Sequence, residues 1–356
     1  SLWFWSRNKT RKSLKGAKMT EPEEKSKIEM QDHIKEKFDT TITAYMKKYK
    51  ISQGVGCVTK GDEILVHSGY GTDADTIFII ASISKMFTRV AIMQLVEKGQ
   101  ISLDTPAFPL LELKPLPGEE FNPQLNQITI VQLINHQAGW DQEVTGDITF
   151  QRSKVAQAVN TDERDVTPTD MVRYMLSKPL QYEPGTKERV YCNFGYSVLG
   201  RVIEKISSQT YIDYIRSQIT SPLGLDSIQL AYEAKEKAYP NEATYEKDSD
   251  GNSNWDPYKD VPLEMADSYG GLVSNSRDLA KFLNHYWRNG YPRHEQLGHY
   301  FNMFGRCAGT LAMAIQRRDG TNVVVLFNNR NNRDNKKDFE LRVISEQVLD
   351  KVIQSD

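Results

Sequence analysis

Hydrophobic and polar positions change their period several times along the chain, and each period predicts a different element. Residues 54–68 alternate between apolar β-branched and polar side chains around a Gly-containing turn, which predicts a β-hairpin. Apolar residues recur at a helical period over 83–95. Two apolar runs, at 311–315 and 322–328, predict a second pair of strands, and 339–353 predicts a closing helix.

The middle of the chain has a different character from its two ends. Residues 131–134, 170–175 and 195–206 show short helical patterns, separated by Pro-rich or polar loops. Strands therefore lie on both sides of a mainly helical stretch. This order predicts an α+β fold, with an antiparallel sheet flanked by helices and a helical lobe inserted between the two halves of the sheet domain. The expected sheet domain comprises residues 29–100 and 262–356, and the expected lobe comprises residues 101–261.

The N-terminal segment, residues 1–28, is unlike the rest. Its first 18 residues contain no acid. They begin with the aromatic-rich Leu2-Trp3-Phe4-Trp5, and six lysines or arginines follow. We expect a disordered, solvated basic tail, with a helix opening near Glu29. Two other interpretations stay open: the border of a membrane anchor, which would bring the protein close to a membrane, or the tail of a targeting peptide.

Composition narrows the class of protein. The 356 residues carry a net charge of −2, whereas nucleic-acid binders usually show a basic excess, and no apolar stretch is long enough for a membrane span. The three cysteines, Cys57, Cys192 and Cys307, predict free thiols in a reducing intracellular compartment, with a mitochondrial or membrane-associated location left open by the N-terminus. No Cys/His spacing typical of zinc and no Gly-rich phosphate loop occurs, so we expect no metal and no organic cofactor.

The strongest chemical signal is Ser82-x-x-Lys85 at the start of a predicted helix. Residues three apart share a helix face, so the two side chains should meet. A buried lysine holds its proton less firmly and can accept one from serine, while the helix N-terminus favours a developing oxyanion. The pattern predicts an activated nucleophile, although Ser-x-x-Lys also occurs by chance.

The second signal is Tyr191-Cys192-Asn193. A tyrosine beside an ammonium group has a lowered pKa and can act as a general base or acid. The amide of Asn193 would hold a substrate carbonyl. Taken alone, the segment is equally typical of a buried tyrosine and an asparagine that caps the next helix.

Four segments together resemble the serine β-lactamase and penicillin-binding protein superfamily, in particular its class C and esterase-like branch. They are 81–88 (Ser-x-x-Lys), 133–139, 184–200 (Tyr-x-Asn) and 270–279 (Gly-Gly-Leu), and they follow the order of the family. The resemblance extends less specifically to the mitochondrial β-lactamase-like proteins of animals. It implies the β-lactamase/transpeptidase-like fold.

The resemblance also implies roles for the site residues. Ser82 would be the nucleophile that forms an acyl-enzyme, with Lys85 as its proton acceptor and Tyr191 as a second acid/base group. Asn193 would orient a small-molecule ester or amide substrate. The backbone N–H of Ser82 would supply half of an oxyanion hole.

The third motif of the superfamily, Lys-Thr-Gly or His-x-Gly, is altered. Its counterpart is Met303-Phe304-Gly305, where Gly305 fits and the backbone N–H of Arg306 would complete the oxyanion hole. Met303 stands where the family has a cation. We expect this change to raise the pKa of Tyr191 and to weaken the binding of anionic β-lactams, unless Arg306 or His299 supplies the charge.

Three functions fit these observations. The first is a serine hydrolase of esterase, amidase or peptidase type, and the second is an acyltransferase or cyclising enzyme that uses the same acyl-enzyme. The third is a catalytically weak scaffold or binding protein, which the intact set of Ser82, Lys85, Tyr191 and Asn193 argues against. The sequence predicts neither the substrate nor the oligomeric state.

Overall fold

The computed structural model describes residues 16–247, 256–293, 298–330 and 334–353. Most of the basic N-terminal segment, residues 1–15, lies outside this part, so the three interpretations of that segment stay predictions. Within the described part, no helix has both the length and the apolar character that crossing a membrane requires.

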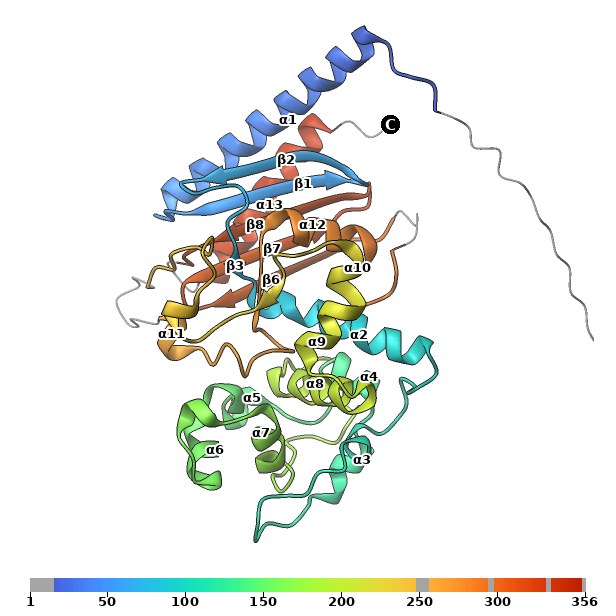
Figure 1. Ribbon diagram of the computed structural model, residues 1–356, viewed down its shortest axis with the longest axis vertical. Helices are drawn as coiled ribbons and strands as arrows, with labels where there is room; N and C mark the ends of the chain where they lie inside the picture. The colour runs from blue at the N-terminus through green and yellow to red at the C-terminus, as the bar shows by residue number, and fades with distance from the viewer. Residues whose placement is uncertain (1–15, 248–255, 294–297, 331–333, 354–356) are drawn as a thin grey trace, which may run out of the picture.

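A five-stranded antiparallel sheet forms the upper half of the molecule (Figure 1). Its strand order is β2-β1-β8-β7-β6, so β1 pairs with β8 and joins the two ends of the chain. Both predicted strand pairs are confirmed, whereas β6 had been expected only as the counterpart of a family motif. The strands are β1 (Gly54–Lys60), β2 (Glu63–Tyr70), β6 (Phe301–Cys307), β7 (Thr310–Gln316) and β8 (Thr321–Phe327).

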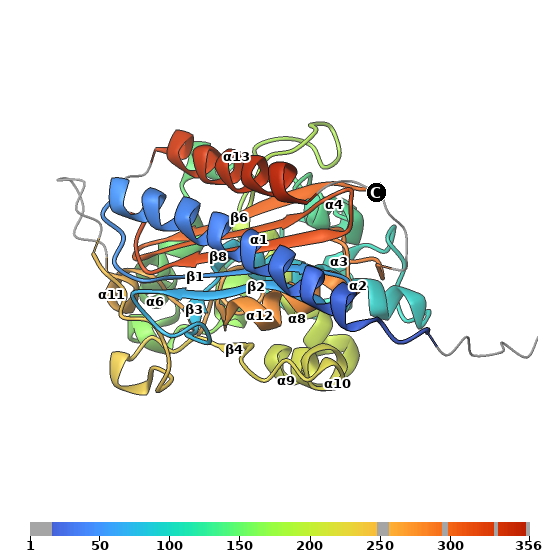
Figure 2. The ribbon, with the colours of Figure 1, turned by 90° about the horizontal axis from the view of Figure 1, so that it is seen from above.

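Two long helices, α1 (Glu21–Lys48) and α13 (Asn335–Val352), lie side by side across one face of this sheet (Figure 2). The pleat explains the covering, because successive side chains of a strand point to opposite faces. Along β8, Val323 and Val325 pack in the cluster beneath the two helices, and Val324 packs in the cluster on the other face. The sheet is therefore buried on both faces.

The helix α1 begins at Glu21, eight residues before the start expected at Glu29. The expectation that residues 21–28 are disordered is wrong. Thr20 and Glu23 form a capping box, and Pro22 occupies the first turn, where its missing N–H costs nothing. These turns are solvent-exposed and project past the sheet (Figure 1), so they carry no apolar period from which a helix could be predicted.

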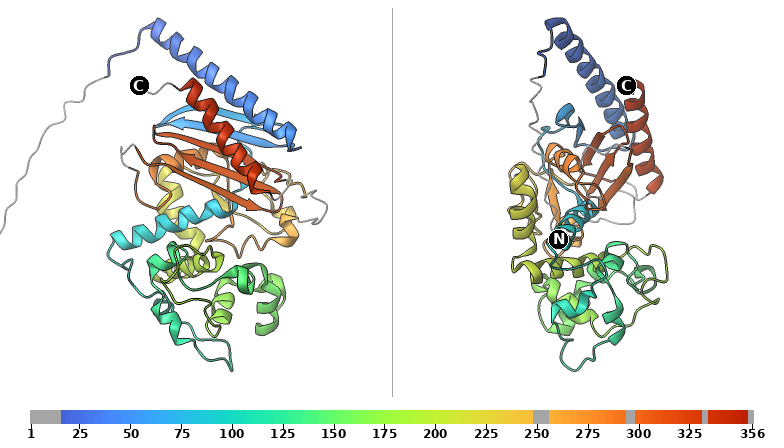
Figure 3. Two further views of the ribbon diagram at one scale, coloured as in Figure 1. Left: turned by 180° about the vertical axis from the view of Figure 1, so that it is seen from behind. Right: turned by 90° about the vertical axis from the view of Figure 1, so that its right-hand side faces the viewer.

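Below the sheet lies the mainly helical half, in which α8 (Asn193–Ser207) packs against α2 (Lys85–Glu97) (Figure 3). The other short helices are α3 (Ala107–Leu111), α4 (Ile130–Ile134), α5 (Gln142–Thr145), α6 (Arg152–Val159), α7 (Pro168–Met175), α9 (Tyr211–Ile215), α10 (Ser221–Leu223) and α11 (Pro257–Asp260). The helix α12 (Ser276–His285) instead packs against β1 and β8 of the large sheet.

A small second sheet connects the two halves. It has the order β3-β5-β4, with β3 (Phe78–Ile79), β5 (Leu272–Ser274) and β4 (Gln229–Leu230). One hydrophobic cluster contains side chains of the large sheet and of the helical half together. The two halves therefore share a core, and the domain boundaries drawn from the sequence stay a prediction.

Candidate active site

Ser82 lies in a single turn of 3-10 helix, η1 (Ala81–Ser84), that leads directly into α2. Both ends of this turn are fixed to one residue of β5. The amide of Ile80 donates to the carbonyl of Leu272 at 3.0 Å, and the amide of Leu272 donates to Oγ of Ser84 at 3.1 Å. Ala81 adopts a positive φ of 46°, a conformation that L-residues rarely adopt. The anchored, strained turn thus holds Ser82 in one position.

Gly305 of β6 faces the same turn from the other side. A Cβ atom at this position would lie 2.0 Å from the carbonyl oxygen of Ile80 and 3.3 Å from Cβ of Ala81. Only glycine lets β6 approach the nucleophile turn so closely. The predicted importance of Gly305 therefore has a steric basis, and the oxyanion role of the Arg306 N–H stays a prediction.

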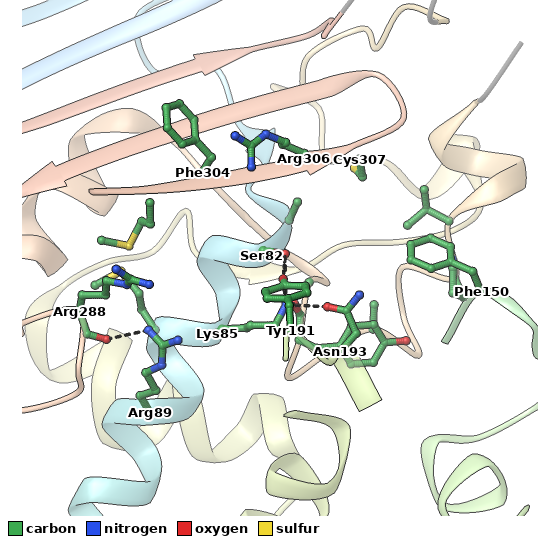
Figure 4. A pocket seen from close by; sticks show the side chains of 18 of the residues that line it. Ser82, Lys85, Arg89, Phe150, Tyr191, Asn193, Arg288, Phe304, Arg306 and Cys307 are labelled. Atoms are coloured by element: carbon green, nitrogen blue, oxygen red, sulfur yellow. Dashed lines mark hydrogen bonds between the residues drawn. The ribbon is translucent and has the colours of Figure 1, made fainter. Parts of the chain in front are cut away.

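The side chains of Ser82, Lys85 and Tyr191 form a closed triangle (Figure 4). Oγ of Ser82 lies 2.7 Å from the hydroxyl of Tyr191, and Nζ of Lys85 lies 3.1 Å from the former and 2.6 Å from the latter. The structure thus brings together the three residues predicted to be catalytic, although Tyr191 lies more than 100 positions from the other two in the chain. A proton can pass from the serine to either partner without a change of conformation.

Lys85 is almost completely buried, at 3% exposure. Its ammonium group also donates to Oδ1 of Asn193 at 2.7 Å and to the carbonyl of Tyr269 at 2.8 Å. Burial lowers its pKa below the usual value, and the cation of Arg89 adds to this effect while Tyr191 opposes it. The lysine is therefore better suited to accept a proton than a lysine in water.

The pKa of Tyr191 also lies below its ordinary value. Burial alone would raise it, but the positive charge of Lys85, hydrogen bonds from Lys85 and Ser82, and the charge of Arg189 lower it. The pKa of Tyr191 is thus lowered although Met303 replaces the family cation, and a rise relative to family members that carry this cation stays a prediction. Arg189, whose guanidinium carbon lies 5.7 Å from the centre of the tyrosine ring, contributes positive charge instead.

Asn193, the first residue of α8, is held by an acid that sequence reasoning missed. Its Nδ2 donates to Oδ2 of Asp147 at 2.8 Å, which leaves Oδ1 directed at Lys85. Oδ1 of Asp147 accepts from the amide and the hydroxyl of Thr149, at 3.0 and 2.7 Å. Asp147 thus fixes the orientation of the amide group of Asn193, and no spacing in the sequence relates the two.

His136 is a structural neighbour of the site. Its ring lies against Tyr191, with 4.7 Å between the ring centres, and its Nδ1 accepts from the amide of Cys192 at 3.1 Å. Burial, with the nearby cations of Lys85 and Arg189, lowers its pKa to about 2, so the ring stays neutral. It positions the Tyr-x-Asn segment through the backbone.

Comparison with known proteins agrees with this geometry. The family model described as Beta-lactamase matches residues 38–302, which is about three quarters of the chain. The chain belongs to the beta-lactamase family. The match ends directly before Met303, so the altered third motif lies just outside it.

Several relatives of this family are similar to the chain. Penicillin-binding protein 4 of Amycolatopsis lactamdurans is 27% identical over 61% of this chain and 53% of its own length. Esterase EstB of Burkholderia gladioli is 25% identical over 53% of this chain and 50% of its own length. The chain thus spans about half the length of these curated relatives. The solved structure of D-amino acid amidase from Ochrobactrum anthropi SV3 covers 91% of this chain and 99% of its own, with a TM-score of 0.66 and 20% identity, which confirms the fold.

Within the family pattern, the third motif departs in the way the sequence indicated. Met303 packs against the cluster on the Ser82 side of the sheet and lines the cleft. The guanidinium of Arg306 instead donates to Oδ2 of Asp338 on α13 at 2.5 Å. The ring of His299 packs against Trp287, and His299 is absent from the cleft lining. His299 therefore does not supply the missing cation, and Arg306 lines the cleft with its charge paired to Asp338.

Besides Lys85 and the Asp338-paired Arg306, three further cations line the cleft, and sequence reasoning missed all three: Arg89, Arg189 and Arg288. A weak signal existed for two of them. Arg89 follows Lys85 by four positions and so shares its helix face, and Arg189 precedes Tyr191 by two. Arg288 comes from the segment after α12, and nothing in the sequence connects it with the motifs. The cleft has a volume of about 530 Å³.

The cysteines and possible metal ligands complete the site. Cys57 and Cys192 are free and buried, and burial raises the pKa of each thiol to about 12, so neither is a reactive thiolate at neutral pH. Cys307 lines the cleft. In the described ranges, His, Cys, Asp and Glu side chains nowhere form a group of three that could hold a metal ion.

Proposed function

We propose that this protein is a serine hydrolase that cleaves small esters or amides through an acyl-enzyme on Ser82. One observation carries the proposal: Oγ of Ser82 contacts two groups with lowered pKa values, Lys85 and Tyr191, that also contact each other. Two interacting groups of this kind titrate as a pair, and both lowered pKa values favour the loss of a proton from it.

In the first half-reaction, Oγ of Ser82 attacks the substrate carbonyl carbon and its proton passes to the Lys85–Tyr191 pair. The bond to the leaving alcohol or amine then breaks, and the pair returns the proton to that group. In the second half, the pair takes a proton from water while the water oxygen attacks the acyl carbon. The bond between that carbon and Oγ of Ser82 then breaks, the pair returns its proton to Oγ, and the carboxylic acid leaves. Asn193 contributes its fixed amide beside the lysine.

The relatives support this reaction class. Proteins similar to the chain are named esterase, D-amino acid amidase and putative D-alanyl-D-alanine carboxypeptidase, and all of these cleave ester or amide bonds. The 530 Å³ cleft has the size of a small-molecule site.

The test is intact-mass labelling of the full chain with a fluorophosphonate probe, together with turnover of 4-nitrophenyl acetate. We expect one adduct per chain, which disappears in Ser82→Ala. The matched control is Ser102→Ala, which removes an exposed serine away from the cleft and should label like wild type. Absence of an adduct on folded wild-type protein would overturn the proposal.

Turnover of the ester then identifies what accepts the acyl group. An acetyl adduct on Ser82 that decays in buffer alone indicates water as the acceptor. If the adduct persists until an amine or alcohol is added, the protein is an acyltransferase and the proposal of hydrolysis is wrong.

A further inference from the structure

Three of the arginines that line the cleft come from separate elements and meet at one place. Arg89 lies on α2, one turn after Lys85, Arg189 lies just before Tyr191, and Arg288 follows α12. All three line the catalytic cleft, and all three also line an adjoining hollow of about 410 Å³. Figure 4 shows Arg89 and Arg288 next to each other beside the catalytic lysine.

No carboxylate neutralises these cations. The described part of the chain contains no Asp or Glu oxygen within 4.0 Å of any of their guanidinium nitrogens. Buried or half-buried arginines elsewhere, such as Arg152 and Arg201, are paired with carboxylates. Here Nε of Arg89 donates to the hydroxyl of Tyr196 at 2.6 Å, and its Nη1 donates to the backbone carbonyl of Arg288 at 3.1 Å.

The charges also disfavour one another. Burial lowers the pKa of Arg288 to about 10, and the neighbouring cations of Arg89 and Arg189 add to this effect. Crowding like charges without a counter-charge costs free energy, which a bound anion would recover. Arginine is also the side chain best suited to bidentate binding of carboxylate and phosphate oxygens.

We propose that Arg89, Arg189 and Arg288 form a subsite that binds a multiply charged oxyanion carried by the substrate, a phosphate monoester or a dicarboxylate. A group with two negative charges fits three cations better than a single carboxylate does. The inference rests on the proposed hydrolase function, because it names the substrate class of that same cleft. The weaker binding of anionic β-lactams expected from the change at Met303 stays a prediction, because the three arginines lie outside β6.

The position of the subsite sets the orientation of the substrate. Arg89 and Lys85 share one face of α2, so an anion held by the arginines lies one helical turn from the lysine that contacts Ser82. The scissile carbonyl then lies at Ser82 and the anionic group points into the adjoining hollow. The apolar side chain of Met303 on β6 also lines the cleft.

The test uses calorimetric titration of the full chain with inorganic phosphate, pyrophosphate and malonate at constant ionic strength. We expect saturable binding, and a loss of affinity of roughly 10- to 100-fold in Arg288→Gln and in Arg189→Gln. The control is Arg164→Gln, because Arg164 is exposed and lies outside both cavities. The ranking of phosphate against malonate tells which anion the subsite prefers.

A kinetic measurement links the subsite to catalysis. The same anions should inhibit turnover of 4-nitrophenyl acetate competitively. Arg288→Gln should lower the ratio of kcat/KM for the 4-nitrophenyl monoester of tricarballylic acid, which keeps two carboxylates, to that for the acetate ester.

Two outcomes would overturn the inference. One is no saturable binding of any of the three anions, and the other is affinities in Arg288→Gln and Arg189→Gln that match those in Arg164→Gln. Since calorimetry does not need an active serine, anion binding without ester turnover would refute the proposed hydrolase function and leave the subsite standing. Retained circular dichroism and melting temperature exclude misfolding, and Arg288 donates no side-chain hydrogen bond that the substitution would remove.

Discussion

Replacing Gly305 with alanine tests whether the close approach of β6 to the nucleophile turn is required for activity. The new Cβ would lie 2.0 Å from the carbonyl oxygen of Ile80, and an ordinary contact begins at 3.4 Å. The strand or the turn must therefore move apart by about 1.4 Å. Because the turn is fixed to Leu272 on both sides of Ser82, part of that movement must reach the serine.

Two magnitudes follow from this displacement. Overpacking of this kind costs about 1–3 kcal/mol of the free energy of unfolding, so the variant should still fold. A misplacement of about 1 Å at a reacting atom can lower the rate about 100-fold. We therefore expect a much larger loss in the acylation rate of Ser82 than in stability.

The assay is the rate of fluorophosphonate labelling, measured beside urea unfolding of the same sample. The matched control is Gly270→Ala, because its added methyl group approaches the same turn but meets Ala81 only at 3.8 Å. It should label at a rate close to that of wild type. If the Gly305→Ala variant is folded and also labels at the wild-type rate, the steric argument is wrong and β6 does not fix the position of Ser82.

Three further predictions concern pH, orientation and stability. The acidic limb of kcat/KM should have an apparent pKa below 10.0, the ordinary value of tyrosine, because the base must be unprotonated and the pKa of Tyr191 is lowered. Arg189→Gln should move this limb to higher pH, because it removes a positive charge that lowers the tyrosine pKa. A limb that does not move would show that the charge of Arg189 has no effect on the base. Asp147→Ala should lower kcat/KM about tenfold, whereas Asp147→Asn, which still offers an acceptor oxygen to the site asparagine, should restore most of it; equal losses in both would contradict an orienting role. Asp267→Ala should cost about 3 kcal/mol in urea unfolding, because it removes a carboxylate 2.6 Å from the buried Arg201, and a loss under about 1 kcal/mol would show that this ion pair contributes little.

The sheet and the catalytic triangle were predictable because each has a local signal. The strands β7 and β8 are continuous apolar runs of strand length, and the Ser82 and Tyr191 segments carry motifs with fixed spacing. The early start of α1 was not predictable from hydrophobic periodicity, since its first turns contact little. Its capping box at Thr20 was a visible signal that periodicity alone does not register.

The orientation of side chains near the site was harder to predict than their identity. Arg306 stands beside Gly305 in the sequence, but alternate residues of a strand point to opposite faces. Gly305 faces Ile80, and Arg306 reaches Asp338 on the other side of the sheet. Once β6 is known to be a strand, the alternation of its side chains predicts that Gly305 and Arg306 point to opposite faces.

The change at Met303 is best understood together with the arginines. In the family pattern one cation on the strand would serve both the tyrosine and an anionic substrate, and here the strand offers an apolar side chain. The pKa of Tyr191 is nevertheless lowered, by Lys85 and by Arg189. Because Arg189 belongs to the segment that carries the tyrosine, and not to β6, its charge acts from another wall of the cleft. An anionic substrate bound there would partly neutralise the charge of Arg189. We therefore expect the acidic limb of kcat, which reports on the enzyme–substrate complex, to lie at higher pH for anionic esters than for neutral ones.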